Sequence, residues 1–197
     1  MILYLHGFRS SPLSFKARLL AERLTGLGIK SAYLCPQLPA SPHAAIALAQ
    51  TCIGQTDLAE LTIIGSSLGD FYATWLAEQI GCRAALLNPA VRPPCDLEKY
   101  IGMHTQYHSD ARFEFKREYI AELEALVIAR IMQPQRYFLI AAKGDEVLDW
   151  HEMMDHYPHA QQLVMEGSYH GISEFSTYAD ALLAFCGVDL DASPAGC

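Results

Sequence analysis

The stretch Ile63–Asp70, IIGSSLGD, contains the spacing G-x-S-x-G centred on Ser67. An apolar run over residues 61–64 comes directly before it, and a helical pattern over residues 71–80 follows. In a strand–turn–helix context the two glycines allow a sharp turn, and the serine is left exposed at the start of the helix. The stretch therefore predicts a turn that presents Ser67 as a nucleophile. A tight turn that merely contains serine is the alternative interpretation.

The rest of the chain alternates short apolar runs with helical patterns. Strands are predicted at residues 2–5, 31–34, 61–64, 84–87, 137–141 and 162–165, and helices at 11–28, 43–52, 71–80, 150–157 and 175–185. Strands separated by helices are typical of βαβ units, whose parallel sheet is covered on both faces. The predicted fold class is therefore α/β, with a mostly parallel sheet of about six strands.

The pattern changes between residues 93 and 133. Charge rises there, and a helix is predicted over residues 116–130 without a preceding strand. Because the strand at 137–141 resumes the earlier rhythm, we interpret residues 93–133 as a cap-like insertion over one end of the sheet. The expected organisation is one domain over residues 1–187, followed by a short flexible tail over residues 188–197.

Composition narrows the class of protein. A chain of 197 residues with 51% apolar residues suits a globular domain, and the net charge of −8 argues against a nucleic-acid partner. The six cysteines are scattered without a C-x-x-C pair, which favours reduced thiols over a disulfide framework. No signal peptide and no apolar run of about 20 residues is visible. A cytoplasmic protein is therefore expected, and its oligomeric state stays open.

A reactive serine needs a base, a group that orients the base, and donors for the oxyanion. In parallel sheets such groups gather at the carboxyl ends of the strands. Asp145 follows the strand predicted at 137–141, and His170 follows the strand predicted at 162–165. The chain order Ser67, Asp145, His170 is that of the α/β-hydrolases, so these residues form the candidate triad.

Neighbouring residues have other interpretations. Asp149 competes with Asp145 as the acid, but a helical pattern follows it at once, so it is expected to be an N-cap. Glu146 is expected to be solvated, and Ser66 to face away from the site. The loop HGF after the first strand offers the N–H of Phe8 as an oxyanion donor, beside the N–H of Leu68.

Five stretches of the sequence carry a resemblance to a known family. They are YLHGFRSSP, IIGSSLGDFYATWLA, LLNPAVRP, KGDEVLDW and EGSYHG. Together they resemble the α/β-hydrolase superfamily and, more closely, the small bacterial esterases of the YqiA/YcfP type, an uncharacterised protein family related to thioesterases and carboxylesterases. The resemblance covers roughly residues 1–187. It implies a reduced α/β-hydrolase fold that lacks the leading antiparallel strands.

The same resemblance implies roles for individual residues. Ser67 is the nucleophile, His170 the base and Asp145 the acid, and the N–H groups of Phe8 and Leu68 form the oxyanion hole. The candidate substrate-binding residues, which line or brace the site, are His6, Gly7, Asn88, Arg92 and Tyr169. For His6, hydrogen bonds that fix the loop are favoured over a part in the chemistry.

Two residues depart from the family pattern. Asp70 stands where the family tends to have glycine. It suits the helix dipole, but it would oppose an oxyanion if its carboxylate pointed into the site. Tyr169 precedes the histidine where a smaller or polar residue is more usual, and it could narrow the pocket.

Metal binding and cofactor binding are not predicted. His104 and His108 have the i, i+4 spacing that can bind a metal on a helix, but no third ligand is evident. Aromatic residues of the insertion could wall an acyl pocket or simply pack; they are Tyr107, Phe113, Phe115 and Tyr119.

The predicted function is that of a serine hydrolase, which cleaves a small-molecule carboxylic ester or thioester through an acyl-enzyme on Ser67. Two alternatives stay open: a non-catalytic ligand-binding protein of the same fold, and an acyltransferase. The preference for esters or thioesters and the acyl chain length also stay open.

Overall fold

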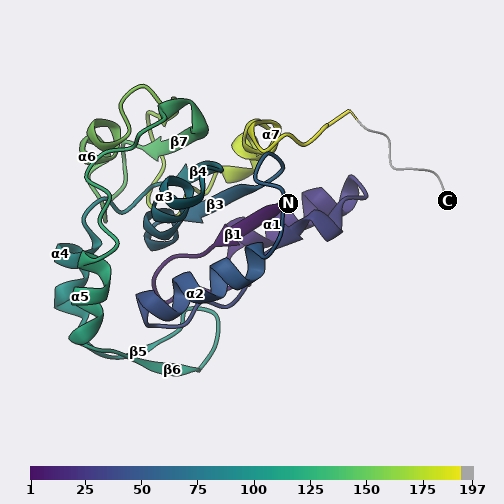
Figure 1. Cartoon of the computed structure of the whole chain (residues 1–197). Coiled ribbons are helices and arrows are strands. Elements are labelled where there is room, and N and C mark those ends of the chain that lie inside the picture. The colour runs from purple at the N-terminus through teal and green to yellow at the C-terminus, as the bar shows by residue number, and fades with distance from the viewer. Residues whose placement is uncertain (192–197) are drawn as a thin grey trace.

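The computed structural model of the chain describes residues 1–191, so residues 192–197 of the predicted tail lie outside the described residues. A six-stranded sheet in the order β2-β1-β3-β4-β7-β8 forms the centre of the molecule. Figure 1 labels its strands β1, β3, β4 and β7. All of its neighbouring strands are parallel. The strands are β1 (Ile2–Leu5), β2 (Tyr33–Leu34), β3 (Thr62–Ser66), β4 (Arg83–Leu87), β7 (Tyr137–Ala142) and β8 (Gln161–Met165). The predicted mostly parallel sheet is confirmed.

Helices pack on both faces of this sheet. On one face lie α1 (Phe15–Gly26) and α7 (Phe175–Phe185). The buried cluster of the other face includes residues of α2 (Pro42–Ile53), α3 (Leu68–Ile80), α4 (Pro93–Leu97), α5 (Glu118–Glu124) and α6 (Trp150–His156). This three-layer arrangement is the one expected for βαβ units.

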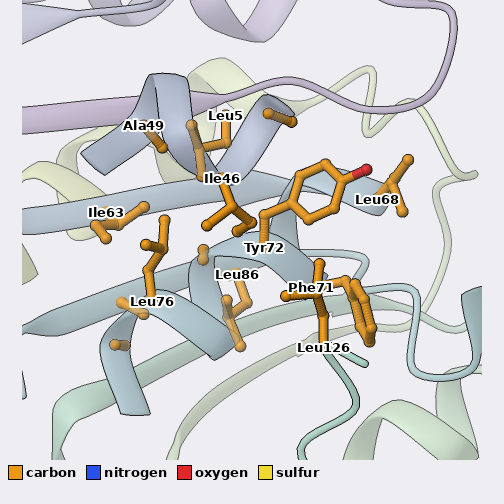
Figure 2. Packing of buried hydrophobic residues seen from close by; sticks show 14 of the residues in the cluster. Leu5, Ile46, Ala49, Ile63, Leu68, Phe71, Tyr72, Leu76, Leu86 and Leu126 are labelled. Carbon is orange, nitrogen blue, oxygen red and sulfur yellow. The ribbon is translucent and has the colours of Figure 1, made fainter. Parts of the chain in front are cut away.

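The strands alternate between the two layers residue by residue. In β1, Leu3 and Leu5 join the cluster with α2 and α3, whereas Ile2 and Tyr4 join the cluster with α1 and α7. Figure 2 shows side chains of α2 and α3 packed with those of the strands, among them Leu5, Ile46, Ala49, Ile63, Tyr72, Leu76 and Leu86. Because both faces are buried, β1 and β7 are continuous apolar runs in the sequence, whereas the edge strand β8 begins with two exposed glutamines.

Two predicted elements near the N-terminus differ from the structure. The helix α1 has Ser14 as its N-cap, whereas Ser11 precedes the helix and accepts a hydrogen bond from the Leu13 N–H at 3.1 Å. Ser11 therefore forms a local turn, which is the other common role of serine beside capping. The second strand is only two residues long because residues 30–32 form a 3-10 turn. A short strand at the edge of a sheet limits pairing with other chains.

The segment 93–133 contains a feature that the sequence did not predict. After α4, an antiparallel hairpin of β5 (Gly102–Thr105) and β6 (Arg112–Phe115) precedes α5. The predicted helix over 116–130 is limited to Glu118–Glu124. The hairpin is fastened to the loop after β1, because the Tyr107 N–H donates to the Arg9 carbonyl at 2.8 Å and Arg9 Nε donates to the Thr105 carbonyl at 3.1 Å.

Candidate active site

Ser67 lies at the junction between β3 and α3, in a backbone conformation that is unusual for serine. Its φ is 57° and its ψ is −116°, and it is the N-cap residue of α3. Non-glycine residues rarely occupy such conformations unless the surrounding structure enforces them. Here the Ser67 N–H donates to the Leu87 carbonyl at 3.2 Å, and the Ser67 carbonyl accepts from the Ala90 N–H at 3.3 Å. These bonds to the end of β4 hold the strained turn in place.

Close backbone packing explains the glycines around this turn. A Cβ atom on Gly69 would lie 1.9 Å from the Leu5 carbonyl oxygen, and one on Gly65 would lie 2.4 Å from the Cα of Asp70. A side chain at either position would therefore displace β1 or α3. A Cβ atom on Gly7 would meet the Cβ of Ser67 at 3.2 Å. The loop after β1 thus lies directly against the serine.

His170 is hydrogen-bonded to the predicted acid. Its Nδ1 atom lies 2.7 Å from Asp145 Oδ2, and the Asp145 side chain is fully buried. The other carboxylate oxygen, Oδ1, accepts from the N–H groups of Val147 at 2.8 Å and Leu148 at 2.9 Å. Both oxygens are therefore engaged, which fixes the carboxylate and directs Nε2 of the imidazole away from it.

Ser67 and His170 line the same two cavities. The first, which we call the Lys16 cavity, has a volume of about 260 Å³. Its lining combines Lys16 and the hydroxyl-bearing residues Tyr4, Ser14 and Ser66 with the aromatic residues Phe8, Phe15 and Tyr107. The second, the aromatic cavity, has a volume of about 200 Å³. Its lining includes Phe8, Tyr100 and Tyr107 together with the charged residues Arg9, Asp96 and Lys99. The structure thus brings the serine and the Asp145–His170 pair to one site between two pockets.

The candidate oxyanion donors flank the serine. Phe8 and Leu68 line the aromatic cavity together with Ser67. Leu68 is the first residue of α3, where the backbone N–H groups have no acceptor within the helix. A helix N-terminus also favours negative charge. The position of both residues is compatible with the oxyanion role predicted for their N–H groups.

His6 fixes the loop that carries Gly7 and Phe8. Its Nε2 accepts from the Leu38 N–H at 3.0 Å, and its Nδ1 lies 3.0 Å from the Gly7 carbonyl oxygen. Burial lowers the pKa of His6, so the neutral ring with one donor and one acceptor nitrogen is favoured. With both nitrogens engaged, His6 positions the loop.

Asn88 connects the ends of β4 and β7 to the loop that follows β8. It directly follows β4 and is fully buried with a φ of 53°. Its Oδ1 accepts from the Ala142 N–H at 2.8 Å at the end of β7, and its Nδ2 donates to the His170 carbonyl at 3.1 Å. Asn88 therefore supports the loop that carries His170 and does not line either cavity.

Arg92 and Tyr169 lie outside the two cavities. The Arg92 guanidinium, with 64% of the side chain exposed, pairs with the carboxylate of Glu152 on α6. Tyr169 is 51% exposed and covers Gly171, where a Cβ atom would lie 2.6 Å from the tyrosine ring. Neither residue lines the Lys16 cavity or the aromatic cavity, so the structure does not bring them into contact with the space beside Ser67.

Asp70 points beneath the turn and away from both cavities. Its Oδ1 accepts from the Leu87 N–H at 3.0 Å, and its Oδ2 is buried with no hydrogen-bond partner among residues 1–191. Burial raises the pKa of Asp70 well above its ordinary value, which favours the neutral carboxylic acid. The repulsion of an oxyanion that the sequence suggested for an inward carboxylate does not arise in this geometry.

The sequence interpretation missed contributions of three residues. Ser66 lines the Lys16 cavity together with Ser67. Glu146 is exposed, as expected, but its Oε2 accepts from the His170 N–H at 3.1 Å and so braces the loop of the base. Lys16 is buried. The sequence indicates this burial, because Lys16, Leu20 and Leu24 are spaced i, i+4 and i+8 and so lie on one helix face. By contrast, Asp149 caps α6 as predicted.

The histidines of the insertion do not share a helix. His104 lies in β5, and His108 lies in the turn that follows, so their spacing does not place them one helical turn apart. His104 Nε2 contacts the Tyr100 carbonyl oxygen at 2.5 Å. Within the part of the chain that the structure describes, no cluster of three potential metal ligands occurs.

The aromatic residues of the insertion pack around one side chain. The Phe8 ring contacts the rings of Phe113 and Phe115, with centroid distances of 5.8 and 5.2 Å. Tyr119 packs on Phe115, whereas Tyr107 lines both cavities. The hairpin therefore holds the loop of the candidate oxyanion donor and contributes one aromatic residue to the pockets.

Comparison with known proteins places this chain in a family. The sequence model of the uncharacterised protein family UPF0227 matches residues 1–187. The chain belongs to this family. The resemblance predicted from the five stretches is thereby confirmed at the level of the family.

Solved structures share the fold at low sequence identity. A protein from Agrobacterium vitis S4 to which a hydrolase activity is ascribed has a TM-score of 0.73 at 15% identity, over 94% of this chain and 87% of that chain. The alpha/beta hydrolase domain-containing protein 10 from mouse has a TM-score of 0.62 at 16% identity, over 94% and 86% of the two chains. The esterase domain of a Rhodothermus marinus protein has a TM-score of 0.66 at 16% identity, over 93% and 85%. The fold is that of the α/β-hydrolases.

The helices were also compared with the requirements of a membrane span. None of the helices within residues 1–191 combines the length and the apolar character needed to cross a bilayer.

Proposed function

We propose that this protein is a serine hydrolase that cleaves small-molecule carboxylic esters or thioesters, and that it acts in the cytoplasm without a cofactor. One observation carries the proposal: the histidine that is hydrogen-bonded to the buried Asp145 lines the same two cavities as the strained Ser67. A serine at a strained turn after β3, an acid after β7 and a base after β8 are the parts that acyl transfer requires. The fold shared with the Rhodothermus marinus esterase domain supports an ester as substrate.

The proposed reaction proceeds through an acyl-enzyme. Nε2 of His170 takes the proton of Ser67 Oγ as the oxygen attacks the carbonyl carbon. The N–H groups of Phe8 and Leu68 stabilise the oxyanion. The C–O or C–S bond then breaks as His170 protonates the leaving alcohol or thiol. A water molecule, deprotonated by His170, releases the acid from the acyl-enzyme and restores Ser67.

Asp145 acts through His170 and not on the substrate. With Nδ1–H directed to the Asp145 carboxylate, the lone pair of Nε2 is available to Ser67. The negative charge also stabilises the imidazolium that forms when the proton moves. Because two backbone N–H groups bind the second oxygen, the carboxylate keeps this orientation throughout the cycle.

Replacing the nucleophile tests the proposal. The Ser67→Ala variant is expected to reduce kcat for 4-nitrophenyl butyrate by about 1,000-fold or more, because the acyl-enzyme cannot form. Ser176→Ala, an exposed serine of α7, is the matched control and should retain the wild-type rate. Circular dichroism verifies that both variants are folded. If Ser67→Ala hydrolyses the ester at the rate of the control, Ser67 is not the nucleophile and the proposal fails.

A further inference from the structure

Lys16 is a buried cation beside the candidate nucleophile. It lies in the first turn of α1, only 8% exposed, and lines the Lys16 cavity together with Ser67 and His170. Burying an ammonium group is costly unless an opposite charge or hydrogen-bond acceptors compensate it. An apolar residue at this position, on the same helix face as Leu20 and Leu24, would cost less free energy to bury. The lysine is therefore not explained by packing alone.

The ammonium group has no direct partner in the protein. Within residues 1–191, Lys16 makes neither a hydrogen bond nor an ion pair. The nearby carboxyl groups that attract it belong to Asp70 and Asp145. Burial favours the neutral acid for Asp70. The Asp145 carboxylate is already hydrogen-bonded to His170 and to two backbone N–H groups. Burial lowers the pKa of Lys16 to about 8, although the nearby carboxyl groups of Asp70 and Asp145 act in the opposite direction.

A second polar group in this cavity also lacks a partner. The Ser14 hydroxyl is buried without a hydrogen bond among the residues that the structure describes. Ser14 lines the same cavity as Lys16, as do the hydroxyl-bearing residues Tyr4 and Ser66. The Lys16 side chain and the unpaired Ser14 hydroxyl therefore line one space of about 260 Å³. A buried hydroxyl such as that of Ser14 normally has a partner, which points to an acceptor that arrives with the ligand.

We propose that the Lys16 cavity binds a carboxylate of the substrate, so that the preferred esters carry a negative charge close to the scissile bond. The carboxylate oxygens accept hydrogen bonds from the Lys16 ammonium and the Ser14 hydroxyl. The proposal rests on the hydrolase function proposed above. One lysine with hydroxyl groups matches a single negative charge better than a phosphate dianion, which is usually held by several cationic or backbone donors.

Matched pairs of esters test this proposal. The carboxylate could belong to the acyl group or to the leaving group. Mono-(4-nitrophenyl) glutarate and 4-nitrophenyl valerate differ by a carboxylate at the end of the acyl chain. Similarly, 4-acetoxybenzoate and its methyl ester differ by a carboxylate on the leaving group. The quantity compared is the ratio of kcat/KM for the anionic ester to kcat/KM for the neutral ester in each pair.

Lys16→Met is the informative variant, because methionine keeps much of the side-chain volume and removes the charge. In the wild type we expect this ratio to exceed one for one of the two pairs. The pair that shows it identifies whether the acyl group or the leaving group carries the carboxylate. Lys16→Met should lower that ratio by about tenfold or more, the effect of losing a hydrogen bond to a charged group. Lys30→Met, an exposed lysine, is the control and should leave the ratio unchanged. Equal ratios in the wild type and Lys16→Met for both pairs would overturn the proposal.

A binding measurement separates this proposal from the hydrolase proposal and does not depend on Lys16→Met being folded. Calorimetry of the Ser67→Ala variant should show tighter binding of the anionic ester than of its neutral partner, by about tenfold or more. Equal affinities contradict the carboxylate site. If the anionic ester binds more tightly but the wild type does not hydrolyse either ester, the hydrolase proposal fails and the carboxylate site stands. If Lys16 only offsets the charge of Asp70, Lys16→Met lowers stability without changing either selectivity.

Discussion

At the scale of single residues, Asp70 is the departure from the family pattern with the clearest physical consequence. The carboxyl group lies under the turn, accepts one N–H at Oδ1, and leaves Oδ2 buried without a partner among residues 1–191. A carboxyl group whose pKa is higher in the folded than in the unfolded chain binds more protons in the folded state. The stability that it contributes is fully present below the unfolded pKa of about 4 and is lost as pH rises toward the folded pKa.

Asp70→Asn is therefore expected to change how stability depends on pH. Asparagine keeps an acceptor for the Leu87 N–H and cannot ionise. Relative to the wild type, the free energy of unfolding of the variant should rise as pH increases from about 4, by about 1.4 kcal/mol for each unit between the two pKa values. Urea unfolding at several pH values measures this difference. The exposed Asp110→Asn serves as the control, and a difference for Asp70→Asn that stays constant with pH would contradict the assignment.

Single residues also show where sequence reasoning succeeds and where it stops. Asp145 and His170 could be proposed because a strand end fixes where a side chain emerges in a parallel sheet. The hydrogen bond from Asn88 to the His170 carbonyl could not be predicted. Residue type and position do not distinguish a residue that supports a loop from one that contacts the substrate. Residue type alone predicts an exposed Lys16, because lysine is usually exposed, whereas its helical spacing with Leu20 indicates the buried face.

At the scale of elements, the β5–β6 hairpin is the part that sequence patterns did not reveal. Its strands are four residues long and mostly half-buried or exposed, so they lack the continuous apolar runs that identified the strands of the central sheet. The hairpin matters for the site because it packs around Phe8, whose N–H is a candidate oxyanion donor. The Arg9 guanidinium also lies 4.5 Å from the centre of the Tyr107 ring.

We expect Phe113→Ala to loosen the loop after β1. The substitution removes one of the aromatic rings packed on Phe8, so the Phe8 N–H is held less firmly where the oxyanion forms. Ester hydrolysis should show kcat reduced by about tenfold with a smaller change in KM, because the contact matters mainly in the transition state. Met103→Ala, 64% exposed on the same hairpin, is the control. A rise in KM with unchanged kcat would assign Phe113 to substrate binding instead.

At the scale of the whole molecule, the site is a product of the strand order. The loop after β1, Ser67 after β3, Asn88 after β4 and the Asp145–His170 pair after β7 and β8 lie at the carboxyl ends of adjacent strands. Because parallel strands place these ends at one edge of the sheet, residues far apart in sequence share one pair of cavities. The alternation of strands and helices was sufficient to predict this arrangement. The shape of the pockets was not predictable, because residues of the segment 93–133 form part of their lining.

The most direct test of the central claim is labelling of the native protein with a fluorophosphonate, followed by peptide mapping. The account predicts modification of Ser67 in the wild type and in His43→Ala, an exposed histidine. In folded His170→Ala the rate of labelling should fall by about 100-fold or more, because the base that activates the hydroxyl is missing. A folded wild-type protein that is not labelled, labelling at another residue, or an equal rate in His170→Ala would contradict the claim that Ser67 is a nucleophile activated by His170.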